Sequence, residues 1–226
     1  MTANESSAVV DIELPDVTLE GELAVPAESS GLVVFAHGSG SSRHSPRNNF
    51  VAERLRERGL GTLLFDLLTE REDRARENRF DIPLLTDRLV ATTEWVRERP
   101  EASGLSIGYF GASTGAAAAL RGAARPETEI DAVVSRGGRV DMAAEVVDGE
   151  ASETPREGGG TVDAPTLLIV GGEDESVLKL NREIHEALSC ERDLRIVEGA
   201  GHLFEGEGEL EAVADHAADW FAAHLE

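Results

Sequence analysis

The sequence has a single cysteine, Cys190, so no disulfide can form within the chain, and nothing favours an oxidising compartment. No apolar run approaches the roughly 20 residues of a transmembrane helix. Residues 1–7 lack the basic start and apolar stretch of a signal peptide. We therefore expect a cytoplasmic protein without a membrane segment, and we expect Cys190 to be packing within a helical segment.

Basic residues are scarce: the chain has 21 arginines and lysines against 44 acidic residues, which gives a net charge of -23, and Lys179 is the one lysine. Such a field disfavours nucleic acids and anionic membranes as partners. Because 41% of the residues are hydrophobic and form clear runs, the acid is expected to coat a folded surface. An acidic surplus with a near-absence of lysine resembles proteins of high-salt cytoplasms, where salt screens the repulsion between surface carboxylates, so we expect folding and activity to need molar salt.

Short apolar runs alternate with amphipathic stretches along the whole chain. Two polar-faced strands open it, and covered strands then alternate with helices, which predicts an α/β fold: a mainly parallel twisted sheet of about eight strands, an antiparallel N-terminal edge and helices on both faces. We expect one domain over 1–226 and no large lid. The predicted strands are 8–14, 17–25, 31–36, 62–66, 105–110, 132–135, 165–170 and 194–197, and the predicted helices include 82–99, 176–189 and 210–225.

Functional sites in such sheets lie at the carboxyl ends of the strands. The loops after Ala36, Asp66, Phe110, Ser135, Val170 and Val197 should therefore share one rim. Residues 69–78 are interpreted as a charge-dense loop, and residues 151–163 as a flap or a solvated loop. The chemistry is expected on this rim.

Two serines match the pattern G-x-S-x-G. Ser113 lies in Gly111-Ala-Ser-Thr-Gly115, between an apolar run and an alanine-rich helix former, whereas Ser106 lies inside the alternating run itself. A strand, tight turn and helix expose a serine on a strained corner, and the glycines allow strand and helix to approach closely. Ser113 is the candidate nucleophile; the alternative is a helix N-cap.

Acyl transfer from serine needs a base and a group that orients the base. Asp174 follows a glycine turn after the strand ending at Val170, and His202 follows the last strand. The order Ser113, Asp174, His202 is that of α/β-hydrolases. Neighbouring Glu173 is the alternative acid; Asp174 could instead cap the next helix, and His202 could be a solvated turn residue.

A tetrahedral intermediate needs donors for its oxyanion. The backbone N–H groups of Thr114 and Ser39 are the candidates, because Thr114 follows the nucleophile and Ser39 lies in the glycine-serine loop after Ala36. That loop lacks the G-K-[ST] of a phosphate-binding loop. We expect no metal and no cofactor.

The chain resembles α/β-hydrolases of the dienelactone hydrolase-like group over nearly its whole length. The resemblance rests on Phe35-Ala-His-Gly-Ser-Gly-Ser-Ser-Arg-His-Ser-Pro-Arg-Asn48, Val134-Ser-Arg-Gly-Gly-Arg139 and Gly199-Ala-Gly-His-Leu-Phe-Glu205. These segments are typical of a subgroup in which some members carry a fused phosphoribosyltransferase domain, and we expect none within these residues. True dienelactone hydrolases use cysteine, so the serine here implies acyl hydrolysis without fixing their substrate.

The same resemblance directs attention to a basic cluster on the rim. Its members could clamp a substrate carboxylate or phosphate, or could form salt bridges to Asp66, Glu70 or Asp141. The cluster comprises Arg43, His44, Arg47, Arg136 and Arg139.

The sequence thus predicts a serine hydrolase that cleaves a small carboxylic ester, thioester or lactone, which could be anionic, through an acyl-enzyme at Ser113. Two alternatives stay open. One is a non-catalytic binding or scaffold protein with this fold, because fold alone does not establish activity. The other is an acyl transferase that uses the same serine. The partner expected in each catalytic case is a small molecule.

Overall fold

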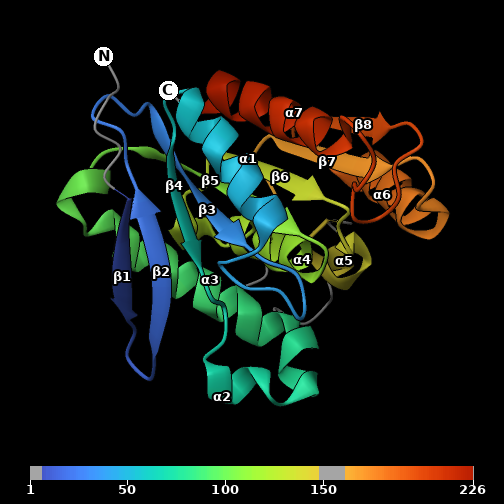
Figure 1. The fold of residues 1–226 in the computed structure, drawn as a ribbon. Helices are drawn as coiled ribbons and strands as arrows, with labels where there is room; N and C mark the ends of the chain where they lie inside the picture. The colour runs from blue at the N-terminus through green and yellow to red at the C-terminus, as the bar shows by residue number, and fades with distance from the viewer. Residues whose placement is uncertain (1–6, 148–160, 226) are drawn as a thin grey trace.

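The computed structural model describes residues 7–147 and 161–225 as one eight-stranded sheet with helices on both faces (Figure 1). The strand order is β1-β2-β4-β3-β5-β6-β7-β8; β1, β2 and β4 pair antiparallel and all other neighbours pair parallel. This confirms the predicted fold class. The strands are Ser7–Glu13 (β1), Thr18–Ala24 (β2), Gly31–Ala36 (β3), Gly61–Phe65 (β4), Ser106–Ala112 (β5), Ala132–Arg136 (β6), Thr166–Gly171 (β7) and Arg192–Val197 (β8).

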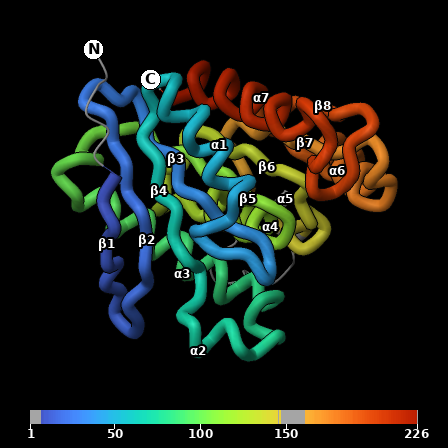
Figure 2. Tube along the Cα trace, in the orientation of Figure 1, coloured from blue at the N-terminus to red at the C-terminus, as the bar shows by residue number. Residues whose placement is uncertain are grey.

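Two helical layers cover the sheet. Helices α1 (Pro46–Glu57) and α7 (Glu209–His224) lie side by side on one face, and α3 (Ile82–Arg97), α4 (Thr114–Ala123) and α6 (Glu175–Ala187) cover the other (Figures 1 and 2). Strand β3 shows why covered strands are apolar throughout: Val33 and Phe35 pack toward α1 and α7, while Leu32 and Val34 pack toward the opposite layer. Among the described residues, no helix is long and apolar enough to cross a bilayer.

Short helical segments occupy several connections. They are α2 (Glu70–Asp73), α5 (Ala144–Val147) and the 3-10 segments Arg76–Phe80, Pro100–Ala102, Pro126–Thr128 and Val140–Ala143. The interpretation of 69–78 as a loop was therefore wrong. The Thr69 hydroxyl accepts a hydrogen bond from the Glu72 N–H, the Glu72 carboxylate accepts one from the Thr69 N–H, and this capping box starts α2. Cys190 was also misplaced, because α6 ends at Ala187. The predicted flap falls mostly on 148–160, outside the described residues.

The sheet order reverses next to β3. From β3 the chain crosses to β4 on one side and then returns to β5 on the other. The loops after β3 and β5 therefore leave the sheet at neighbouring strand ends and run in opposite directions. Doubly wound sheets bind ligands in the crevice between two such loops.

Candidate active site

Ser113 stands alone between β5 and α4 with φ 52° and ψ -117°. This conformation is strained for a residue with a Cβ. The backbone is held there by two bonds, from the Ser113 N–H to the Arg136 carbonyl (3.1 Å) and from the Arg139 N–H to the Ser113 carbonyl (3.0 Å). Although Ser113 occupies the N-cap position of α4, its side chain makes no capping hydrogen bond. The hydroxyl is therefore not used to cap the helix.

The predicted close approach at the two glycines is confirmed. A Cβ on Gly111 would lie 2.4 Å from Ala116 Cα, and one on Gly115 would lie 2.1 Å from the Ala36 carbonyl oxygen. Only glycine fits at either position. Ser106 is the first residue of β5, at the end of the strand away from this turn, as the alternating pattern predicted.

Asp174 and His202 form a direct pair. The Asp174 Oδ2 to His202 Nδ1 distance is 2.6 Å, and the aspartate side chain is 13% exposed against 39% for the histidine. Asp174 sits at the N-cap position of α6 without capping it, and Glu173 is exposed. The geometry thus selects Asp174 over Glu173 as the histidine's partner. A carboxylate on Nδ1 leaves Nε2 as the outward nitrogen.

The end of β6 connects this pair to Ser113. Arg136 accepts the Ser113 N–H, and the next residue, Gly137, lies under the imidazole with φ 53°. A Cβ on Gly137 would be 3.3 Å from His202 Cε1. Ser113 and His202 thus flank the same two residues of β6 and its loop.

The loop after β3 approaches the serine from the other side. A Cβ on Gly38 would lie 3.1 Å from Ser113 Cβ, and the Ser39 N–H donates to Thr114 Oγ1 at 2.8 Å. The two predicted oxyanion residues are therefore adjacent. The Ser39 amide is engaged by the threonine hydroxyl, so its predicted role requires exchange of that bond for the substrate oxygen. This use of the Thr114 side chain was not foreseen, because the motif indicates only its backbone N–H.

Buried His37 fixes the start of this loop. Its Nε2 accepts the Leu67 N–H (3.1 Å), so Nδ1 carries the proton and donates to the Gly38 carbonyl (3.0 Å). Burial lowers the pKa of His37, which favours the neutral ring that this bonding requires. Its position is structural: it ties the β3 and β4 loops together.

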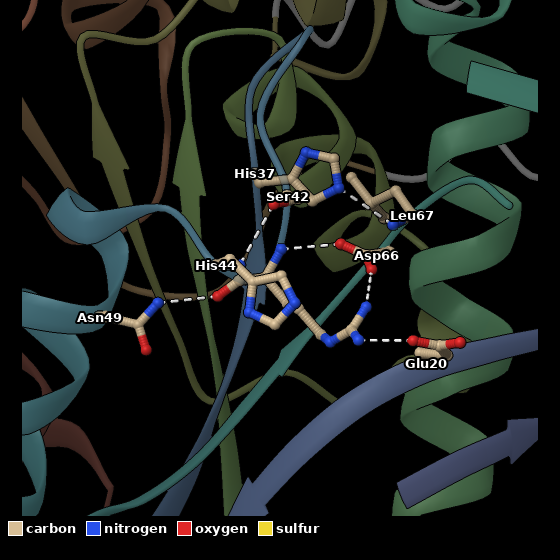
Figure 3. Close-up of polar contacts among 8 residues, drawn as sticks. Glu20, His37, Ser42, His44, Asn49, Asp66 and Leu67 are labelled. Carbon is tan, nitrogen blue, oxygen red and sulfur yellow. Dashed lines mark hydrogen bonds and ion pairs between the residues drawn. The ribbon is translucent and has the colours of Figure 1, made fainter. Parts of the chain in front are cut away.

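Two of the five basic rim residues are held by carboxylates. Asp66 binds both the backbone N–H and the guanidinium of Arg43, and Glu20 binds the other guanidinium nitrogen (Figure 3). Arg139 forms a two-bond pair with Asp141, at 2.9 Å for each bond, which lowers the pKa of that carboxyl. The salt-bridge alternative is favoured for both arginines.

The other three differ. His44 is exposed, with its backbone N–H bonded to Ser42 Oγ (Figure 3). In the part of the chain that the structure describes, Arg47 forms a long ion pair, 3.9 Å from Nη1 to Glu205 Oε1. Arg136 is buried, and neither its Nε nor its Nη1 has a hydrogen-bond partner in the described part of the chain. The structure thus separates Arg136 and Arg47 from the paired arginines.

Phe204 is a neighbour of the site that sequence reasoning missed. It is buried, has φ 53°, and its ring centroid lies 6.0 Å from Arg136 Cζ. Nothing in its residue type signals this, although it follows His202 by two positions. A hollow of about 330 Å³ opens on the same loop beside His202. In the described ranges, no three histidine, cysteine or acidic side chains gather as a metal site would require.

Two proteins of Mycobacterium tuberculosis strains, each called "Putative phosphoribosyl transferase", are 51% identical to this chain over 216 residues. The match covers 96% of this chain and 46% of theirs, so the chain spans about half the length of these relatives. Their name describes proteins about twice as long.

Solved structures agree with the fold. A dienelactone hydrolase from Anabaena variabilis is 47% identical, with a TM-score of 0.89 over 98% of this chain and 99% of that one. Est1E from Butyrivibrio proteoclasticus shares the fold at 16% identity, with a TM-score of 0.76 over 96% of this chain and 98% of that one. The model of the dienelactone hydrolase family matches residues 19–226. This chain belongs to the dienelactone hydrolase family of α/β-hydrolases.

Proposed function

We propose that this protein is a serine hydrolase that cleaves a small carboxylic ester, thioester or lactone through an acyl-enzyme at Ser113. One observation carries the proposal: Ser113 and Asp174 both stand at helix N-caps without capping, while Asp174 holds His202 at 2.6 Å beside the serine turn. Because neither side chain is used to cap its helix, the Ser113 hydroxyl and the Asp174 carboxylate are available for the proposed chemistry. Family membership supports hydrolysis in general.

The proposed reaction has two steps. His202 Nε2 takes the Ser113 proton while Oγ attacks the carbonyl carbon, and Asp174 keeps the Nδ1–H tautomer and stabilises the imidazolium. The N–H groups of Thr114 and Ser39 would hold the oxyanion, after the Ser39 amide leaves Thr114 Oγ1. The leaving alcohol or thiol takes the proton from His202, and water then hydrolyses the acyl-enzyme by the same route.

The phosphoribosyl transferase name is not extended to this chain, because the match covers under half of the named proteins. The charge of -23 and the single lysine support a protein of a high-salt organism. We also propose a cytoplasmic location and a single domain over residues 1–226. An acyl transferase would use the same residues with an alcohol or amine in place of water. A scaffold protein would leave the serine unreactive.

A fluorophosphonate probe separates these cases. We expect wild-type protein in high-salt buffer to be labelled on Ser113, and labelling to be lost in Ser113→Ala and His202→Ala. Ser106→Ala is the matched control, since it removes the serine of the competing motif and should label normally. Folded wild-type protein that stays unlabelled would support the scaffold. Release of an ester product when an alcohol is added to a turned-over substrate would support the transferase.

A further inference from the structure

Arg136 is a buried cation to which the described residues offer no ion-pair partner. It ends β6, its residue is 8% exposed, and its Nε and Nη1 lack hydrogen-bond partners among the described residues. Phe204 provides the nearest ring, at 6.0 Å. A charge buried without a counter-charge is costly, and folds normally pair it or neutralise it.

The chain contains many carboxylates that could pair with Arg136. Acidic residues outnumber basic ones by 44 to 21, and the comparably buried Arg88 is bonded to both Asp16 (2.7 Å) and Glu72 (3.0 Å). On the same rim, Arg139 has Asp141. Within the described ranges, Arg136 is therefore a local exception, since Arg88, the other buried arginine there, is paired twice.

The charge of a second cation, Arg47, acts on Arg136. Burial, and after it the charge of Arg47, lowers the pKa of Arg136 to about 10, so the guanidinium is still charged at neutral pH. Arg47 is the second residue of α1, whose first turn contains no acidic residue and whose N-terminus is capped by the Ser45 hydroxyl, which accepts the Asn48 N–H at 3.4 Å. Among the described residues, the carboxylate that pairs with Arg47 is Glu205, 3.9 Å away on a side chain that is 72% exposed.

The position is next to the chemistry. The Arg136 carbonyl accepts the Ser113 N–H, and Phe204 follows His202 by two residues. A group held by Arg136 would thus belong to a substrate whose ester carbonyl lies at Ser113. This step rests on the proposed function.

Two guanidinium groups favour a ligand with two negative charges. A carboxylate would balance one guanidinium, whereas a phosphate monoester at neutral pH carries close to two charges and accepts forked bonds from both. We propose that Arg136 and Arg47 form a subsite for the phosphate monoester of a phosphorylated ester or lactone. The phosphate is not transferred: the bond cleaved is the carboxylic ester at Ser113, and the phosphate leaves unchanged on one product.

Inorganic phosphate is the probe, measured by calorimetric titration at pH 8 with ionic strength held constant by potassium chloride. We expect saturable one-site binding, weakened at least about tenfold in Arg136→Met and in Arg47→Met, as the loss of a charge-assisted bond implies. Arg54→Met is the matched control on the same helix, since its guanidinium already pairs with Glu57 and Asp215, and it should bind as wild type. Equal affinity in all four proteins, or acetate binding as tightly as phosphate, would overturn the proposal.

Two further measurements distinguish loss of phosphate binding from unfolding and from failure of the serine mechanism. Replacing an unpaired buried charge by an apolar side chain should leave the Tm of Arg136→Met no lower than that of wild type, so a loss of binding would not reflect unfolding. Phosphate should raise the Tm of wild type and leave that of Arg136→Met unchanged. Ser113→Ala should bind phosphate normally while losing fluorophosphonate labelling, so failure of the subsite and failure of the serine mechanism give different results.

Discussion

The Asp174 and His202 pair gives the sharpest prediction about catalysis. Asn in place of Asp174 keeps the size and shape of the side chain but removes the charge that accepts the Nδ1–H at 2.6 Å. An amide can turn its NH₂ toward Nδ1, which then acts as the acceptor, and the imidazole carries its proton on Nε2. A protonated Nε2 cannot accept the proton of Ser113.

The size of the effect follows from burial and bond type. The aspartate side chain is 13% exposed, so the bond to an imidazolium is a partly buried, charge-assisted one, with a contribution of about 1.5–3 kcal/mol. That alone lowers kcat roughly 10- to 150-fold. The wrong tautomer adds to it, and in serine proteases the equivalent change lowers kcat about 10⁴-fold. We expect a loss of about 10² to 10⁴ in kcat, with KM for a small neutral ester changed little.

Hydrolysis of p-nitrophenyl acetate in high-salt buffer measures both constants. Glu173→Gln is the control, because it makes the same chemical change one residue away on an exposed side chain. The control should retain wild-type kinetics, and both variants should keep the wild-type Tm within a few degrees. If Asp174→Asn kept kcat within twofold of wild type, the pairing with His202 would be structural and the assigned mechanism would fail.

Three other perturbations test the fold. Gly115→Ala should destabilise by about 3 kcal/mol or more, because its Cβ would meet the Ala36 carbonyl at 2.1 Å, whereas Gly201→Ala, with open space, should be nearly neutral in denaturant unfolding. Burial raises the pKa of Glu72, but bonds from Thr69 and Arg88 outweigh it and leave the pKa lowered; stability from this carboxylate is therefore full above its ordinary value of 4.5 and is lost as pH falls below it. Glu72→Gln should be less stable than wild type at pH 7 and converge on it in acid; a constant difference in urea midpoints would contradict this. Finally, Tm should rise steeply between low salt and about 2 M potassium chloride, because screening relieves the net charge of -23, and a flat Tm would refute the high-salt expectation.

The sequence was sufficient where a pattern reports directly on packing. Two polar-faced strands and six apolar runs predicted the eight described strands. Ser113 follows the end of β5 as expected, and Ser106 is a residue of that strand, although it is the first one and does not lie inside the strand. Glycine spacing at 111 and 115 indicated a close approach that the distances now quantify. These features are set by local chain geometry and by burial on both faces of a sheet, which the order of residue types records.

Pairing between distant side chains was not predictable in the same way. Arg43 and Arg136 look alike on the chain, yet one binds Asp66 and Glu20 while the other has no hydrogen-bond partner among the described residues. The sequence named Asp66 and Asp141 among three candidate partners of the basic cluster, and they bind Arg43 and Arg139. Which arginine would pair with which carboxylate, and which would not pair, depends on what the finished fold brings within reach. The bond from the Ser39 amide to the Thr114 hydroxyl was hidden for the same reason, since it joins residues 75 positions apart.

Strand β6 has a larger part in this site than its short sequence suggests. The strained backbone of Ser113 costs on the order of 1–3 kcal/mol, and the bonds that hold it come from the Arg136 carbonyl on one side and the Arg139 amide on the other. Gly137 between them leaves room for the His202 ring. The segment that keeps the serine strained therefore also positions the base and carries the unpaired cation. A backbone shift here would disturb nucleophile, base and cation together, whereas neutralising Arg136 alone removes only the charge and leaves the two backbone bonds intact. Under the proposed function, substitution of the Arg136 side chain would thus separate substrate recognition from catalysis, which substitutions in the Ser113 turn cannot do.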